Sequence, residues 1–309
     1  MNHRVIRHAL LATAAMALAA GFAPGATAGG PHRDMSHAKR VLFVSNVDGN
    51  LHIYTASIHR NNPPLLGTIS DGTSRPEGVW VDRKDTLYVE NGPQYPKQAD
   101  IEEYKRGATT PFRTITDGLY SPGAVAVGSD GTVYVNQLGE KDGGLIGVVA
   151  VYAPGETKLE RTIALNAQPE YGMSAGGMAV DPQGNIYAAT FGNATEVHVF
   201  RIAPGSSTAT DLGLQGYGGS AIAIDGTGNL YAGGGDGFIA VYPPGATSPS
   251  RTISFATPVN GMIAARNGTL YAVTNSSVAE FAPGASTPTN YVGTDYGETL
   301  TYDAALGFQ

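Results

Sequence analysis

Short runs of apolar and polar residues alternate along most of this chain, and Gly, Pro, Asp and Asn separate them. One pattern occurs five times: "RPEGVWVDRKDTLYVENG" (75–92), "PGAVAVGSDGTVYVN" (122–136), "GGMAVDPQGNIYAAT" (176–190), "SAIAIDGTGNLYAGG" (220–234) and "NGMIAARNGTLYAVT" (260–274). Each copy has an apolar run, a tight break and a second apolar run. This pattern predicts paired β-strands, and no apolar stripe of helical period occurs after residue 28. We therefore expect an all-β fold.

The repeat has a nearly fixed length. The second apolar runs are spaced 40 to 53 residues apart and begin at Leu42, Leu87, Val133, Ile186, Leu230 and Leu270. A third run follows each of them, and several third runs lead into a fourth segment such as "FRTIT" (112–116), "ERTIAL" (160–165) or "SRTISF" (250–255). Four short strands in roughly 40–45 residues are typical of one blade of a β-propeller. The polar "RTI" segments are expected at the outer edge of their blades.

The two ends of the repeat region complete each other. The segment "VLFVSN" (41–46) matches a second strand without a first strand before it, and "ETLTYDAALG" (298–307) matches a first strand without a second strand after it. Pairing of these segments removes the free edges of an open array. The sequence therefore predicts a single six-bladed β-propeller with four-stranded blades over residues 41–309, with the last blade closed by both termini.

The first 28 residues have the features of a secretory signal peptide. Arg4 and Arg7 precede an apolar stretch that is too short to span a bilayer, and Ala26-Thr27-Ala28 is a small-x-small cleavage pattern. Residues 29–40 are expected to be a flexible lead-in, and the mature protein is expected to be secreted or periplasmic. The chain has no Cys, so its core must hold it without disulfides.

Charge and composition narrow the classes of partner. The formal net charge is −7, and no run of Lys and Arg occurs, which argues against a nucleic-acid surface. No later segment has the length of a membrane span. We expect a monomer. No Ser–His–Asp set, Cys nucleophile or phosphate-binding Gly loop can be assembled, so no catalytic residue is assigned.

The residue before each inner strand is expected at one mouth of the central channel, where the copies differ most. These residues are Glu77, Gly123, Gly176, Ser220, Asn260 and Glu298. The blades of Glu77, Asn260 and Glu298 are neighbours in a closed ring, so their side chains should converge. Two carboxylates and an amide oxygen are ligands suited to calcium. The alternative is that these positions are simply solvated.

Aromatic residues distinguish the same loops. Tyr120, Tyr171, Tyr217 and Tyr296 precede inner strands in four blades. A Tyr at the mouth offers a flat apolar face with a hydrogen-bonding tip, which suits a small molecule, a glycan or a protein. Alternatively, each Tyr packs against its own loop. Trp80, the only Trp, is expected in the core, and the Asn residues that end second strands, such as Asn91 and Asn136, are expected to stabilise turns.

The Pro-x-Gly, "AVD" and Gly-Asn-Leu-Tyr elements of the repeat resemble those of the NHL-repeat propellers and, more distantly, of the gluconolactonase/regucalcin family of six-bladed calcium-dependent hydrolases. The resemblance covers residues 41–309. In the hydrolase family a Glu, an Asn and an Asp before inner strands hold the metal. Glu77 and Asn260 match this set, and Glu298 stands where an Asp would be expected.

The sequence favours a non-enzymatic binding scaffold that holds a ligand or a protein at one mouth of the channel. A calcium-dependent lactonase-like hydrolase is the first alternative, and a purely structural envelope-interaction protein is the second. The hydrolase would need calcium, whereas the scaffold needs no cofactor.

Overall fold

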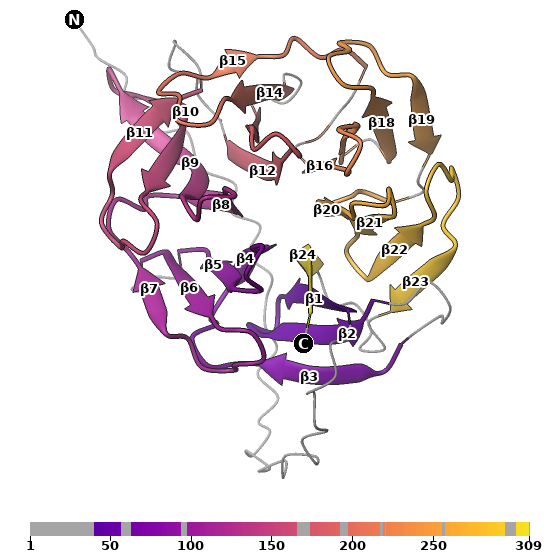
Figure 1. The fold of residues 1–309 in the computed structure, drawn as a ribbon, viewed down its shortest axis with the longest axis horizontal. Helices are drawn as coiled ribbons and strands as arrows, with labels where there is room; N and C mark the ends of the chain where they lie inside the picture. Colours follow the sequence, from indigo (N-terminus) through magenta and orange to yellow (C-terminus); the bar gives the residue numbers. More distant parts are fainter. Residues whose placement is uncertain are drawn as a thin grey trace, which may run out of the picture. The chain divides into compact units, whose positions relative to one another are not determined.

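The computed structural model describes residues 40–56, 63–93, 98–165, 174–191, 197–216, 219, 221–235, 237–254, 257–293 and 301–308. These residues form 24 β-strands and no helix. No helix long and apolar enough to cross a membrane occurs among them. The strands make six antiparallel sheets of four strands each, arranged in a ring as the blades of a β-propeller (Figure 1).

The blades are numbered in chain order, and their strands are given from the centre of the ring outwards. Blade 1 consists of β24 (Thr301–Phe308), β1 (Arg40–Asn46), β2 (Leu51–Thr55) and β3 (Leu65–Ile69), and blade 2 of β4 (Pro76–Val81), β5 (Leu87–Asn91), β6 (Asp100–Tyr104) and β7 (Arg113–Ile115). Blade 3 consists of β8 (Pro122–Val127), β9 (Val133–Lys141), β10 (Gly144–Tyr152) and β11 (Arg161–Ala164), and blade 4 of β12 (Ser174–Val180), β13 (Ile186–Phe191), β14 (Val197–Ile202) and β15 (Thr210–Asp211). Blade 5 consists of β16 (Ala221–Ile224), β17 (Leu230–Gly233), β18 (Phe238–Tyr242) and β19 (Arg251–Ser254), and blade 6 of β20 (Gly261–Ala264), β21 (Leu270–Val273), β22 (Ser277–Phe281) and β23 (Asn290–Gly293).

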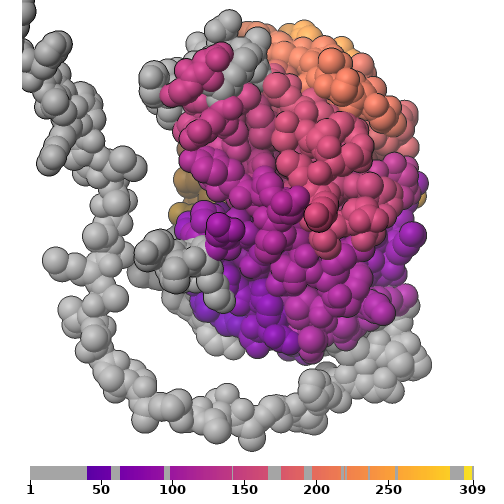
Figure 2. Space-filling view, turned by 90° about the vertical axis from the view of Figure 1, so that its left-hand side faces the viewer, coloured from indigo at the N-terminus to yellow at the C-terminus, as the bar shows by residue number. Residues whose placement is uncertain are grey.

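The repeat predicted from the sequence is confirmed strand by strand. Five second strands begin at the predicted residues, and β1 begins two residues before Leu42. The "RTI" segments form β7, β11 and β19, which are the outermost strands of their blades. Figure 2 shows one side of the ring, where the colours pass from indigo to orange as successive blades follow one another.

Both ends of the chain build blade 1, as predicted. The C-terminal strand β24 pairs antiparallel with β1, and Leu306 lies opposite Leu42 (Figure 1). The strand covers residues 301–308 and so begins three residues after the predicted start at Glu298. Because β24 packs beside β4 of blade 2 on one side and β20 of blade 6 on the other, it closes the ring.

The hydrophobic core lies between neighbouring blades. In one cluster Ile101 and Ile115 of blade 2 pack with Val125, Val133 and Val135 of blade 3. Fully buried Tyr side chains on third strands supplement this packing with hydrogen bonds to loop carbonyls. Tyr104 donates to Asp71 O at 2.7 Å, and Tyr152 donates to Asp117 O at 2.7 Å. The rigid stack of blades fixes the positions of the six inner strands that surround the channel.

Candidate ligand-binding cavity

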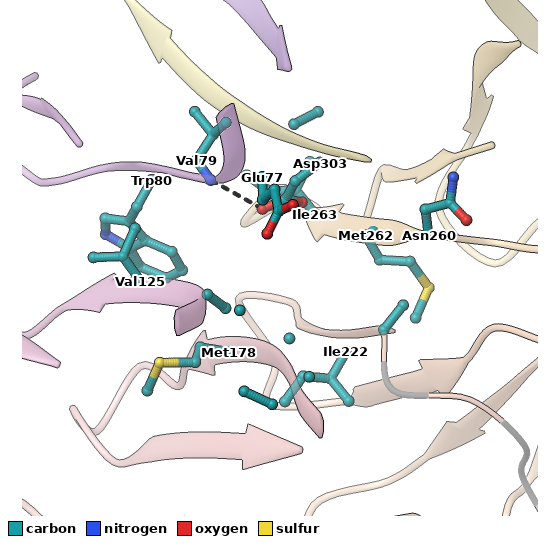
Figure 3. A pocket seen from close by; sticks show the side chains of 18 residues that line it. Glu77, Val79, Trp80, Val125, Met178, Ile222, Asn260, Met262, Ile263 and Asp303 are labelled. Atoms are coloured by element: carbon teal, nitrogen blue, oxygen red, sulfur yellow. Dashed lines mark hydrogen bonds between the residues drawn. The ribbon is translucent and has the colours of Figure 1, made fainter. Parts of the chain in front are cut away.

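A cavity of about 120 Å³ lies where the six inner strands meet (Figure 3). All six strands, β4, β8, β12, β16, β20 and β24, contribute to its lining. Each inner strand pairs with a neighbour on one side only, so its other backbone edge faces the channel. The cavity wall therefore presents peptide groups as well as side chains, and these need water or a ligand as hydrogen-bond partners.

Irregular pairing places selected residues in this wall. In β4 the register shifts between Pro76 and Gly78, which leaves Glu77 as the extra residue. The same shift makes Gly123 the extra residue of β8. In β24 residues 302 and 303 together face the single residue Ser45 of β1. Such β-bulges redirect side chains, and here each brings a cavity-lining residue to the channel.

Glu77 is the first acidic residue of the cavity. Its Oε1 lies 2.7 Å from Nε of Arg75, and its side chain is 21% exposed. Burial raises the pKa of Glu77, and the charge of Arg75 opposes this rise. The carboxylate lies over Gly92, where a Cβ would stand 2.6 Å from Cδ of Glu77. Gly92 thus leaves the space that Glu77 occupies.

Asp303 is the second acidic residue, on β24. Its Oδ2 accepts a hydrogen bond of 3.1 Å from the backbone N–H of Val79, which bridges blades 1 and 2. Ser45 Oγ accepts from the N–H of Asp303 at 2.8 Å and donates to its carbonyl at 3.1 Å, which fixes the bulge. Burial raises the pKa of Asp303 to about 7, although the N–H groups of Val79 and Ala304 favour the ionised form. Both protonation states are therefore populated near neutral pH.

Glu90 lies in the wall behind Glu77 and is 0% exposed. Neither of its carboxylate oxygens has a hydrogen-bond partner among the described residues. Burial raises its pKa well above the ordinary value, and the negative charge of Glu77 acts in the same direction. The nearby backbone N–H of Gly78 acts against this rise. Burial therefore favours the protonated form of Glu90.

The rest of the cavity is built from small and apolar residues. Gly123 lies where β8 approaches β12 so closely that a Cβ would stand 2.7 Å from the carbonyl oxygen of Ala175. Figure 3 shows Met178 and Ile222 on the opposite side of the cavity from Glu77 and Asp303. The cavity therefore has an acidic side, from blades 1 and 2, and an apolar side, from blades 4 and 5.

Trp80 corrects one prediction from the sequence. It lies on inner strand β4 as expected, but it is only partly buried, and it lines the cavity beside Val125 (Figure 3). Its ring also packs against the clusters on both sides of blade 3. A core assignment was favoured because a single large aromatic residue in an apolar run is usually buried. Trp80 is instead positioned to report on the cavity contents.

Two of the three predicted calcium ligands line the cavity. Asn260 immediately precedes β20, and its Nδ2 donates to Oδ1 of Asn275 at 2.8 Å. In Figure 3 its amide lies away from Glu77 and points out of the cavity. Glu298 lies outside the described residues. Within the described part of the chain, no three His, Cys, Asp or Glu side chains form a group that could hold a metal ion. The calcium site remains a prediction.

Only one of the four predicted Tyr ligands can be placed. Tyr120 lies just before β8 and is 56% exposed, and its backbone N–H donates to Oε1 of Gln137 at 3.1 Å. It is not among the described residues that line the cavity. Tyr171, Tyr217 and Tyr296 lie outside the described residues, so their role as ligand contacts also remains a prediction.

Of the two Asn residues predicted to stabilise turns, Asn91 ends β5, whereas the prediction for Asn136 is wrong because Asn136 lies inside β9 (Val133–Lys141). Asn91 Oδ1 accepts from the N–H of Ser74 at 3.1 Å, which ties β5 to the segment entering β4. Asn136 Nδ2 donates to the carbonyls of Gly176 and Ala189, at 2.8 and 2.6 Å, in the next blade. Asn136 occupies in β9 the register position that Glu90 occupies in β5. Asn136 thus joins blades 3 and 4, whereas Glu90 makes no side-chain hydrogen bond among the described residues.

Sequence reasoning missed Asp303 and Glu90. Asp303 lies inside a segment identified as an inner strand, where alternation alone does not show which residue a bulge turns toward the channel. Glu90 had a detectable signal, because it stands where the next copy of the repeat has Asn136. A comparison of the known protein families and of curated proteins with this chain finds no match. The assignment therefore stops at the fold: the chain is a six-bladed β-propeller.

Proposed function

We propose that the protein is an exported, non-enzymatic binding scaffold that holds its ligand in the central cavity. The observation that carries this proposal is the cavity itself, which all six blades line and which has an acidic and an apolar side. A concave site in which a few polar side chains stand among apolar ones is the usual form of a small-molecule site. The rigid blades also present its rim to larger partners.

Trp80 provides the experiment. It is the only Trp in the chain and it lines the cavity, so its emission reports on a bound molecule directly. A library of small metabolites, sugars and peptides is titrated into the protein while the emission is recorded. We expect at least one class to shift the emission with saturation. Turnover of lactones or esters that is lost in Glu77→Ala would overturn the non-enzymatic proposal.

Export rests on the N-terminal segment described above. If it is a signal peptide, the secreted or periplasmic protein begins after Ala28. N-terminal sequencing of the protein recovered from outside the cytoplasm tests this. Recovery of the full-length chain from the cytoplasm alone would contradict it.

One observation favours the calcium-dependent hydrolase as a second candidate: Glu77 and Asn260 line the same cavity. A bound ion would stabilise the folded state according to its concentration and affinity. The hydrolase therefore predicts a higher melting temperature with calcium than with a chelator, and loss of this difference in Glu298→Gln. An unchanged melting temperature in the unsubstituted protein would remove this candidate.

A further inference from the structure

The cavity has few polar side chains, and those that carry a charge are all acidic. Of the 18 described residues that line it, only Glu77, Asn260 and Asp303 have polar side chains. The other fifteen are Gly, Ala, Val, Ile, Met or Trp, and none is Lys, Arg or His. An unoccupied cavity of this composition attracts positive charge.

The protein compensates this negative charge only in part. Arg75 pairs with Glu77 from the rim and does not itself line the cavity. No described Lys, Arg or His forms an ion pair with Asp303, which has only backbone N–H donors. Behind Glu77, the wholly buried Glu90 has no partner for either oxygen. A Cβ on Gly78, the residue after Glu77, would stand 3.3 Å from Oε2 of Glu90. Of the two carboxylates that line the cavity, Glu77 thus has one cationic partner and Asp303 has none among the described residues.

The apolar side determines which kind of cation fits. A calcium ion takes six to eight oxygen ligands, and the side chains of Met178 and Ile222 on the wall opposite Glu77 and Asp303 supply none of them. An organic cation with a short hydrocarbon chain satisfies both sides at once. The volume of about 120 Å³ is slightly below that of cavities of about 150 Å³ that hold benzene. A chain of about four carbons is therefore the right size.

We infer that the central cavity binds a short primary alkylammonium group, with its nitrogen toward Glu77 and Asp303 and its hydrocarbon chain toward Met178 and Ile222. This inference rests on the proposed function and names the ligand class of the same site. Such a group occurs in free amines and at the end of a Lys side chain of another protein. The two sources share the chemistry, and the experiment separates them.

The test is a titration of the full chain followed by Trp80 emission, with n-butylammonium, n-butanol and butyrate as probes. These molecules have similar size and differ in charge. We expect saturable binding of n-butylammonium and no saturation with the other two up to about ten-fold higher concentration. Equal binding of n-butanol, or no binding of n-butylammonium or a lysine derivative, would overturn the inference. A response to some other class in the library screen would then leave the proposed function intact.

The source of the ammonium group is separated by a second arm with Nα-acetyl-lysine amide. Tighter binding of n-butylammonium indicates a free amine, because the cavity then has no room for a peptide backbone at its mouth. Tighter binding of the lysine derivative indicates a side chain presented by a partner. Either result supports the recognition of an ammonium group.

Variants show whether the acidic side acts as inferred. Glu77→Gln and Asp303→Asn keep the shape of each side chain and remove its charge. Each should weaken n-butylammonium binding by about ten-fold. The control is Glu160→Gln, an exposed carboxylate next to outer strand β11 that should leave binding unchanged. If both cavity variants bind as tightly as the unsubstituted protein, the inference is wrong.

Discussion

Two pairs of inner strands contain the same feature, a β-bulge, but place different kinds of residue in the cavity wall. In β4 and β24, a bulge carries an acidic residue, Glu77 or Asp303, into the cavity wall. In β8 and β12, the bulge carries glycine at Gly123 or at residues 176 and 177. At Gly123 the glycine is dictated by packing, because even a methyl group would collide with the next blade.

The acidic side has no such packing reason. Glu77 extends over Gly92 to Arg75, and Asp303 accepts one backbone hydrogen bond across a blade boundary. Both contacts place carboxylates in a cavity wall, where burial raises their pKa values. The propeller uses the bulges for its geometry, and we propose that the acidic residues on two of them serve a ligand.

The largest expected effect is on stability, from a substitution at the glycine bulge of β8. Gly123→Ala places a Cβ 2.7 Å from the carbonyl oxygen of Ala175, so β8 and β12 must separate. We expect a loss of about 3 kcal/mol in the free energy of unfolding, measured by urea denaturation. The control is Gly235→Ala, where a Cβ meets nothing within 4 Å. If both variants are equally stable, close approach does not explain the glycine bulge.

Glu90 tests what the acidic side costs in stability. Its folded-state pKa lies well above the ordinary value. The contribution of the protonated carboxyl group to the free energy of unfolding is therefore fully present below about pH 4 and is lost as the pH rises toward the folded-state pKa. Glu90→Gln removes this loss and adds amide donors, as Asn136 has in the next blade. We expect it to be about 2 kcal/mol more stable than the unsubstituted protein at pH 8.

Urea denaturation at pH 5 and pH 8 measures this effect, and the gain in stability should be smaller at pH 5. The exposed Glu160→Gln serves as the matched control. A Glu90→Gln variant that loses stability at both pH values would show that the carboxyl group has a partner that the described residues do not reveal.

The contribution of Asp303 to the free energy of unfolding should depend on pH less than that of Glu90, and over a defined pH range. Because burial raises its pKa to about 7, the stabilising contribution of the protonated form is lost between about pH 4 and pH 7. Asp303→Asn keeps an oxygen acceptor for the N–H of Val79 and removes the titration. We expect a gain of about 1 kcal/mol at pH 8 and none at pH 4, since water in the cavity reduces the cost of the charge. An identical pH dependence of unfolding in both proteins would contradict this assignment.

Glu77→Ala should change stability least. Its ion pair with Arg75 is partly exposed, and such pairs contribute little. We expect the free energy of unfolding, obtained from the melting temperature, to change by no more than about 0.5 kcal/mol, while ligand binding is lost. A large loss of stability would indicate that Glu77 is structural and would remove the distinction between the two kinds of bulge.

The sequence predicts the blades well because alternation and repeat length act locally. The strands that begin at Leu87, Val133 and Ile186 follow from apolar runs bounded by turn residues. The pairing of β24 with β1 follows from counting incomplete repeats at the two ends. These features require no knowledge of how one blade approaches the next.

The cavity could be predicted only in part. Glu77 and Asn260 were found because they differ from the other copies at one repeat position. Asp303 was not found, because a bulge adds one residue without changing the apolar pattern. The partial exposure of Trp80 depends on the small residues that surround it on other blades, which include Ala124 and Gly177. Such contacts between distant segments are set by packing in three dimensions.

The most direct test of the account is a crystal structure of the protein grown with n-butylammonium, compared with one grown without it. The account predicts density for the amine in the central cavity, with the nitrogen within hydrogen-bonding distance of Glu77 or Asp303 and the carbon chain against Ile222. A cavity filled by the protein's own Tyr side chains, or the amine bound elsewhere on the surface, would contradict it.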